Sequence, residues 1–381
     1  MRQPDGAYAA ASAAELPAIQ SGSFSVYRLF DLGEEIDLDT AHSYLAEYTA
    51  GERAPARAHE ASSIQVAKQP IRAKLGPAVL QVGDRTESGL MRGTIYDLGV
   101  VALAIEVVLP QPTDWGTVAD LFKSAPELPE PISAQFMTAV DLLEHKLRPA
   151  VVRPRRSAIV EDYGILVVER LADGASVQDL RGHPLVWAAV LGERRPLSPD
   201  AAGLVTGMSY YPDDLALLGW SGALLIDPDP VAASTAIDLV EFGQVELLLM
   251  RVYDAGLDEQ LPGMYRLISR PRSQFILPLV RGYGGALHET QRLIAEVTEV
   301  TERVDNALKV TDDVYWNRLY TALVTVLRID VWRRGVEHKL TLLRQTYGLL
   351  QDEASAERAL ALELTIIVLI ALEIVLALLK R

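Results

Sequence analysis

The chain has 381 residues, of which 49% are hydrophobic and 23% are charged, a balance that predicts a folded globular protein and excludes an intrinsically disordered one. Its net charge of −15 argues against broad nonspecific binding to nucleic acid, so double-stranded DNA is not an expected partner. The absence of cysteine excludes disulfides, zinc–thiolate sites, iron–sulfur clusters and thiol nucleophiles.

Residues 1–22 are rich in Ala and polar side chains and are expected to form a disordered leader, without the charged start and apolar core of a secretory signal. A body of mixed strands and helices is expected over residues 23–275. Strands are predicted at 24–30, 63–67, 78–82, 93–109, 158–171 and 215–226, and helices at 38–50, 115–124, 132–147 and 231–253, with short helices near Val177 and Leu185. Strands and helices without strict βαβ alternation favour an α+β fold.

The character of the sequence changes after residue 285. Apolar residues then recur at alternate spacings of three and four over 286–350, which predicts a long antiparallel, coiled-coil-like helical hairpin. This seam is a candidate contact between copies of the chain, and two ordinary amphipathic helices packed on the body are the alternative. Its members are Ile294, Val297, Val304, Val326, Ile329, Val336, Leu340, Leu343 and Tyr347.

Residues 359–379 form an almost uninterrupted apolar run, with Glu363 near its start and Glu373 deeper within it. A helix of this length reaches across a bilayer, and its Leu, Ile and Val residues favour insertion. The sequence therefore predicts a C-terminal transmembrane helix. The expected location is a single-pass anchor in the bacterial inner membrane, with the lipid bilayer as a partner and the body in the cytoplasm.

No common catalytic, nucleotide-binding or metal-binding motif is present, and the six histidines are never paired at ligand spacing, so no cofactor or metal is expected. Polar residues are densest between Tyr210 and Leu261. Two interpretations are open: these residues form structural ion pairs, or they form a pocket for a divalent cation or small ligand. The pocket candidates are Asp213, Asp214, Glu241, Arg251, Asp254 and Asp258.

A basic cluster lies between Lys146 and Arg156 and is broken by Pro149 and Pro154. A solvated linker is the simplest interpretation of such a run. The alternative is local binding of lipid headgroups or an RNA backbone by Arg153, Arg155 and Arg156.

Four segments carry a resemblance to a known family. They are the run Glu241–Leu261, which contains Arg-Val-Tyr-Asp and Leu-Asp-Glu-Gln-Leu; Tyr96–Val101; the series Trp332, Val336, Lys339, Leu340 and Tyr347; and the set Glu363, Ile366, Ile370 and Glu373. In order and spacing these resemble the "required for meiotic nuclear division" family over residues 24–379, and the chain looks like a bacterial-type member.

The resemblance implies a membrane-attached homo-oligomer, because mitochondrial relatives self-assemble at the inner membrane and support translation. The leading hypothesis is therefore a membrane-anchored assembly or scaffold protein without an evident catalytic site. A metal-dependent hydrolase acting on nucleotides or RNA at the membrane is an alternative. A translation-associated RNA-binding accessory, with a ribosome or membrane-protein partner, is another.

Overall fold

A computed structural model of the protein describes residues 16–49, 68–82, 84–172, 175–198, 200–268, 288, 291–292, 294–299, 301–302 and 314–379. These residues divide between two compact units. The first lies within Met1–Val252 and Arg303–Val331, and the second within Tyr253–Glu302 and Trp332–Arg381.

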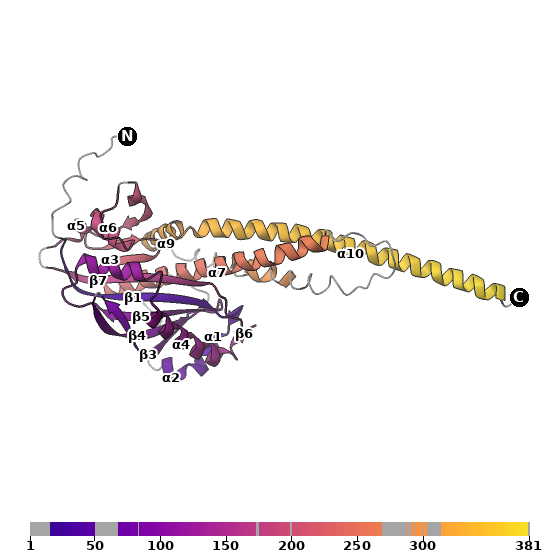
Figure 1. The fold of residues 1–381 in the computed structure, drawn as a ribbon, viewed down its shortest axis with the longest axis horizontal. Coiled ribbons are helices and arrows are strands. Elements are labelled where there is room, and N and C mark those ends of the chain that lie inside the picture. Colours follow the sequence, from indigo (N-terminus) through magenta and orange to yellow (C-terminus); the bar gives the residue numbers. More distant parts are fainter. Residues whose placement is uncertain are drawn as a thin grey trace. The chain divides into compact units, whose positions relative to one another are not determined.

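An eight-stranded sheet forms the centre of the first unit (Figure 1). Its spatial order is β3 (Ile71–Val82), β4 (Arg85–Ile95), β5 (Val100–Val108), β1 (Ile19–Asp31), β7 (Val160–Leu171), β10 (Gly222–Ile226), β9 (Leu215–Leu218) and β8 (Thr206–Met208). Neighbouring strands are antiparallel except β7 and β10, which are parallel. A separate two-stranded ladder joins β2 (Glu35–Ile36) to β6 (Val151–Val152).

One face of the sheet carries α3 (Trp115–Ser124) and α4 (Glu130–Leu147). Side chains alternate between the faces of a strand, so Phe24 and Arg28 of β1 point to the same side. Phe24 packs edge-on against Phe122 of α3, with ring centroids 5.4 Å apart, and Arg28 donates to Ser133 of α4. The remaining short helices are α1 (Leu38–Tyr44), α2 (Ala46–Thr49), α5 (Val177–Arg181), α6 (Pro184–Val190) and the 3-10 turn η1 (Ala201–Leu204).

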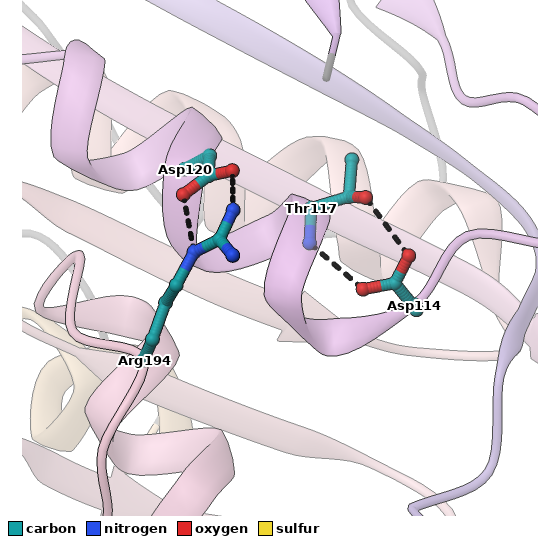
Figure 2. Close-up of polar contacts among 4 residues, drawn as sticks. All are labelled: Asp114, Thr117, Asp120 and Arg194. Carbon is teal, nitrogen blue, oxygen red and sulfur yellow. Dashed lines mark hydrogen bonds and ion pairs between the residues drawn. The ribbon is translucent and has the colours of Figure 1, made fainter. Parts of the chain in front are cut away.

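Side chains fix both the start of α3 and its attachment to a later loop (Figure 2). Asp114 caps the helix by accepting hydrogen bonds from the backbone N–H and the hydroxyl of Thr117, both at 2.9 Å. The Nε of Arg194 donates to Asp120 one turn further on, at 2.8 Å. An N-cap carboxylate satisfies N–H groups that the first helical turn leaves free, which is why α3 begins where the sequence predicts.

The opposite face of the sheet is covered by the first half of α7 (Pro230–Ile268), which reaches Val252 within this unit. Its polar side chains meet strand residues, since Asp238 pairs with Arg72 and Arg251 pairs with Glu161. Helix α9 (Val314–Val326) packs beside it, and Tyr320 donates its hydroxyl hydrogen to Glu246. These contacts place α7 between the sheet and α9.

The expected mixture of a sheet with helices is confirmed, with differences in detail. Residues 93–109 divide between β4 and β5 because a turn at Tyr96–Gly99 separates them, and 215–226 divide between β9 and β10. The expected leader overlaps the sheet, because β1 begins at Ile19. The predicted strand at 63–67 lies outside the described residues.

The second unit contains the end of α7, helical turns at 294–299 and α10 (Ile329–Leu379) from Trp332 onward. Lys339 of α10 lies 2.7 Å from a carboxylate oxygen of Asp254 and 2.7 Å from one of Asp258, both on α7. Arg344 of α10 donates to the hydroxyl of Thr298 at 2.8 Å. These contacts hold the three helical segments of this unit together.

Four seam residues of the second unit, Val297, Val336, Leu340 and Leu343, are at most 5% exposed within a single chain. Ile294 and Tyr347 are half-buried there, as is Val326 of the first unit, where Ile329 is fully buried. Val304 lies outside the described residues. The helix expected through residue 350 is interrupted between α9 and α10, where Arg328 has a φ of 52°. Because most of the described seam residues are buried within one chain, packing inside the chain is an alternative explanation for the seam to contact between copies.

The expected C-terminal transmembrane helix is wrong. Residues 359–379 are helical as part of α10, but no helix within the described part of the chain is long and apolar enough to cross a membrane. The physical reason is that the carboxylates of Glu363 and Glu373 interrupt the apolar run and oppose its transfer into hydrocarbon. The predicted single-pass anchor in the bacterial inner membrane depends on that helix and is therefore also wrong. The same holds for the predicted membrane role of Glu363, Ile366, Ile370 and Glu373.

Candidate functional site

A polar cavity of about 140 Å³ lies in the first unit, between the sheet and the first turns of α7. Strands β1, β3, β4 and β5 supply one wall, and Ser234, Asp238 and Glu241 of α7 supply the other. This volume is enough for several water molecules or for a ligand of roughly ten non-hydrogen atoms.

Strand register explains why residues distant in sequence meet at this cavity. Tyr27 of β1 is opposite Ala104 of β5, Ala104 is opposite Arg92 of β4, and Arg92 is opposite Lys74 of β3. Residues in register share a face of the sheet, so all four point toward α7. The small Ala104 leaves space between Tyr27 and Arg92, which opens the cavity.

Two ion pairs frame the rim. Arg72 lies 2.5 Å from a carboxylate oxygen of Asp238, and their side chains are 38% and 36% exposed. Arg92 lies 2.8 Å from a carboxylate oxygen of Glu106, and these side chains are 50% and 32% exposed. Each of these two guanidinium groups is therefore partnered by a carboxylate at the rim.

The floor of the cavity is buried and contains two ionisable groups. Tyr27 is 7% exposed, and its hydroxyl makes no hydrogen bond to any residue that the structure describes. Glu241 is also 7% exposed and accepts a hydrogen bond from the hydroxyl of Tyr96 at 2.7 Å. Because Tyr27 lines the cavity, its hydroxyl can offer a hydrogen bond to a polar molecule there, and one such bond contributes roughly 1 kcal/mol.

Burial dominates the ionisation of the site. It raises the pKa of Glu241 to about 7, although the hydrogen bond from Tyr96 acts in the opposite direction. Burial also raises the pKa of Asp238, opposed by Arg72, and the pKa of Tyr27, where the nearby carboxylates of Glu241 and Asp238 add to the effect. Glu241 therefore exchanges its proton near neutral pH, whereas Tyr27 remains a neutral donor and acceptor.

The six sequence-predicted pocket residues do not gather at one place. Only Glu241 lines the cavity. Asp214 is buried and accepts the backbone N–H groups of Tyr210 and Tyr211, at 2.8 and 2.9 Å, while Asp213 is exposed beside it. Those two bonds make Asp214 a residue that stabilises its own turn.

The other candidates are also engaged in structural pairs. Arg251 is paired with Glu161 of β7, and Asp254 and Asp258 share Lys339 in the second unit. In the described part of the chain, no group of three or more His, Asp or Glu side chains is arranged to hold a metal ion.

The basic cluster is largely neutralised by carboxylates. Arg153 lies 2.5 Å from Glu34, and Arg156 lies 2.6 Å from Asp141 and 3.4 Å from Glu144. The charge of Arg155 acts on the buried carboxyl of Asp31 and lowers its pKa, although burial raises that pKa overall. These pairs favour a structural role for the cluster over anion binding.

Sequence reasoning missed most of the cavity, including Tyr27, Arg72 and Arg92. One signal was present in β1, where Ser23, Ser25 and Tyr27 alternate with apolar residues and so share a face. A polar stripe on a strand that is buried on both faces predicts a polar compartment. The partner strands that complete it were not evident from local pattern.

The fold and site define a mixed α/β protein with a large sheet, helices on both faces and a small polar cavity under the longest helix of its first unit. Residues 21–232 match the family described as "Uncharacterized protein MJ0711, N-terminal domain", and the chain belongs to that family. It is 25% identical over 179 residues to "Uncharacterized protein MJ0711" from Methanocaldococcus jannaschii, a match covering 46% of this chain and 53% of the relative. The chain thus spans about half of that relative's length. No solved structure matches the chain.

The predicted membership of the "required for meiotic nuclear division" family is therefore wrong, and so is the bacterial-type assignment. The motifs behind that resemblance are short and mostly apolar. Burial explains the most distinctive run, since Leu247, Leu248, Leu249 and Met250 are each at most 1% exposed in α7. Central helices of unrelated folds share such composition because they occupy the same environment.

Proposed function

We propose that this protein is a homo-oligomeric scaffold, assembled through the last turns of α10. The supporting observation is that eleven Leu, Ile and Val side chains between Leu362 and Leu378 are each 51–68% exposed in the single chain. Packing one face of this segment against a second copy removes roughly 500 Å² of apolar surface per chain, which for two chains reaches the order of 1,000 Å² that specific interfaces bury. Monomeric proteins rarely expose a contiguous apolar surface of more than a few hundred Å², and the eleven side chains together exceed that area.

The positions of the carboxylates select one face of the helix. At about 100° per residue, Val368, Leu372 and Val375 project together, and Glu363 and Glu373 each lie roughly 140° from the centre of that stripe. Packing along this stripe leaves both carboxylates in water and avoids the cost of burying them. A second copy of the same stripe is its best-matched partner, because both surfaces are apolar and carry no charge.

Two double variants test this assignment. Val368→Glu with Leu372→Glu charges the proposed contact, whereas Ile366→Glu with Ile370→Glu places the same change, at the same spacing, on the side of the carboxylates. The full chain and the second variant should have masses that are multiples of 41.7 kDa by light scattering, and the first variant should approach the single-chain mass. Circular dichroism verifies that both variants remain helical.

A full chain that stays at 41.7 kDa at micromolar concentration would refute the proposal. Equal loss of mass in both double variants would refute the choice of face. A large complex that depends on a different protein would replace self-assembly with docking of that protein.

A further inference from the structure

We propose that the cavity under α7 is a binding site for a small, neutral polyhydroxyl compound of polyol or pentose size. This site is independent of assembly through α10. Four hydroxyl-bearing side chains line it: Ser23, Ser25 and Tyr27 from β1, and Ser234 from α7. None of these four hydroxyls makes a hydrogen bond within the described residues.

The neutral character of the ligand follows from the rim. Arg72 and Arg92 are each held by a carboxylate, at 2.5 and 2.8 Å, so neither guanidinium needs an anion from outside. A carboxylate or phosphate ligand would also approach Glu106 and Asp238, which line the same space. A ligand hydroxyl both donates and accepts, so it suits carboxylate oxygens and guanidinium N–H groups together.

The size of the ligand follows from the cavity and its small residues. Its volume of about 140 Å³ is below the range typical of drug-sized ligands, which begins at about 300 Å³. Ala104 lines the strand side on the face toward α7, where a larger side chain would fill the space. The buried Tyr27 hydroxyl supplies a fixed contact at the floor, and the hydroxyls of Ser25 and Ser234 supply contacts from two different elements.

Ligand-observed NMR on the full chain at pH 7.5 provides the test. Xylitol and ribose are the neutral probes, and inorganic phosphate and acetate are the anionic probes. Saturation transfer from the protein to xylitol or ribose is expected. Neither of these neutral probes should be displaced by acetate or phosphate at equal concentration. If neither xylitol nor ribose shows saturation transfer, the cavity is a water site and the proposal is overturned. Displacement by the anions would overturn its neutral character.

Substitutions in the cavity wall test whether the probes bind in this cavity. Tyr27→Phe removes only the floor hydroxyl and should weaken xylitol binding by about tenfold, the usual scale for losing one buried hydrogen bond. Ala104→Leu fills the space between Tyr27 and Arg92 and should abolish binding. Tyr163→Phe is the matched control, because Tyr163 is the cross-strand neighbour of Tyr27 and its hydroxyl already donates to the carbonyl of Gly219 at 3.0 Å.

The control should bind as the natural chain does. Ser25→Ala is a milder second variant in case Tyr27→Phe or Ala104→Leu perturbs folding, which circular dichroism reports. Unchanged xylitol binding in folded Tyr27→Phe and Ala104→Leu proteins would place the ligand elsewhere and overturn the assignment. Loss of binding in Tyr163→Phe alone would do the same.

Discussion

Tyr96 donates its hydroxyl hydrogen to Glu241 across 2.7 Å, and both residues are at most 7% exposed. This bond joins the turn between β4 and β5 to the first third of α7. It also fixes the position of a cavity-lining carboxyl group whose pKa is raised by burial to about 7. The stability of the first unit is therefore expected to depend on the ionisation of Glu241.

Glu241 should make the protein less stable as pH rises from about 4.5 to 7. Burial raises its pKa from the usual 4.5 to about 7 in the folded chain, so across this window the unfolded state loses the proton while the folded state retains it. The free energy of unfolding should then fall by at most about 1.4 kcal/mol per pH unit from this group, and level off above pH 7. Asp31, whose pKa burial also raises to about 7, adds a slope of the same sign.

Glu241→Gln isolates this contribution. The amide keeps an acceptor for Tyr96 but cannot ionise, so the variant should be more stable than the natural chain at pH 8, by roughly 1–3 kcal/mol, and should show a smaller pH slope. Urea unfolding at pH 5, 6, 7 and 8 measures both quantities. An unchanged slope would show that Glu241 does not titrate in this window.

Gly99 should tolerate no side chain. It has a φ of 82°, and a Cβ there would lie 2.0 Å from the backbone oxygen of Gly33. Because Gly99 ends the turn that positions Tyr96, Gly99→Ala should lower the free energy of unfolding by about 2 kcal/mol or more. Gly256→Ala is the control, since a Cβ there meets nothing within 4 Å inside α7 and should stabilise the chain by about 0.5–1 kcal/mol. Equal effects of the two substitutions would contradict this explanation.

Lys339→Met should weaken the second unit. The change removes the ammonium group that lies 2.7 Å from Asp254 and from Asp258, and takes this cation away from the 19%-exposed carboxylate of Asp254. Hydrogen exchange in the last turns of α7 should accelerate, consistent with a loss of about 1 kcal/mol. Lys68→Met, which breaks the exposed 3.4 Å pair with Glu35, should change stability by less than about 0.5 kcal/mol. Unaltered exchange near Asp254 in Lys339→Met would contradict the role of this bridge.

Local sequence patterns predicted much of the fold because the ends of several helices and strands are determined by residues close to them in sequence. The expected helix at 115–124 has the bounds of α3, since Asp114 provides an N-cap that depends on neighbouring residues only. The turn that separates β4 from β5 was missed, because Tyr96-Asp-Leu-Gly99 lies between two apolar runs that look continuous. The glycine at its end was the available signal.

The cavity depends on interactions that a local pattern does not contain. Arg72 and Asp238 are 166 positions apart, and only the strand order β3-β4-β5-β1 and the placement of α7 bring them together. Glu241 was recognised as part of a polar helix, but its partner Tyr96 lies 145 positions away. Acidic residues close to Glu241 in sequence, such as Asp254, were grouped with it although they belong to the second unit.

The rate at which single introduced thiols react along α10 tests the central claim, assembly through one face of that helix, most directly. The chain has no cysteine, so Leu372→Cys and Ile370→Cys each provide one thiol, at side chains that are 54% and 52% exposed in the single chain. In concentrated protein the thiol at position 372 should react with a bulky maleimide about tenfold more slowly than the thiol at 370, and dilution should remove the difference as the copies separate. Equal rates at every concentration would contradict assembly through this face.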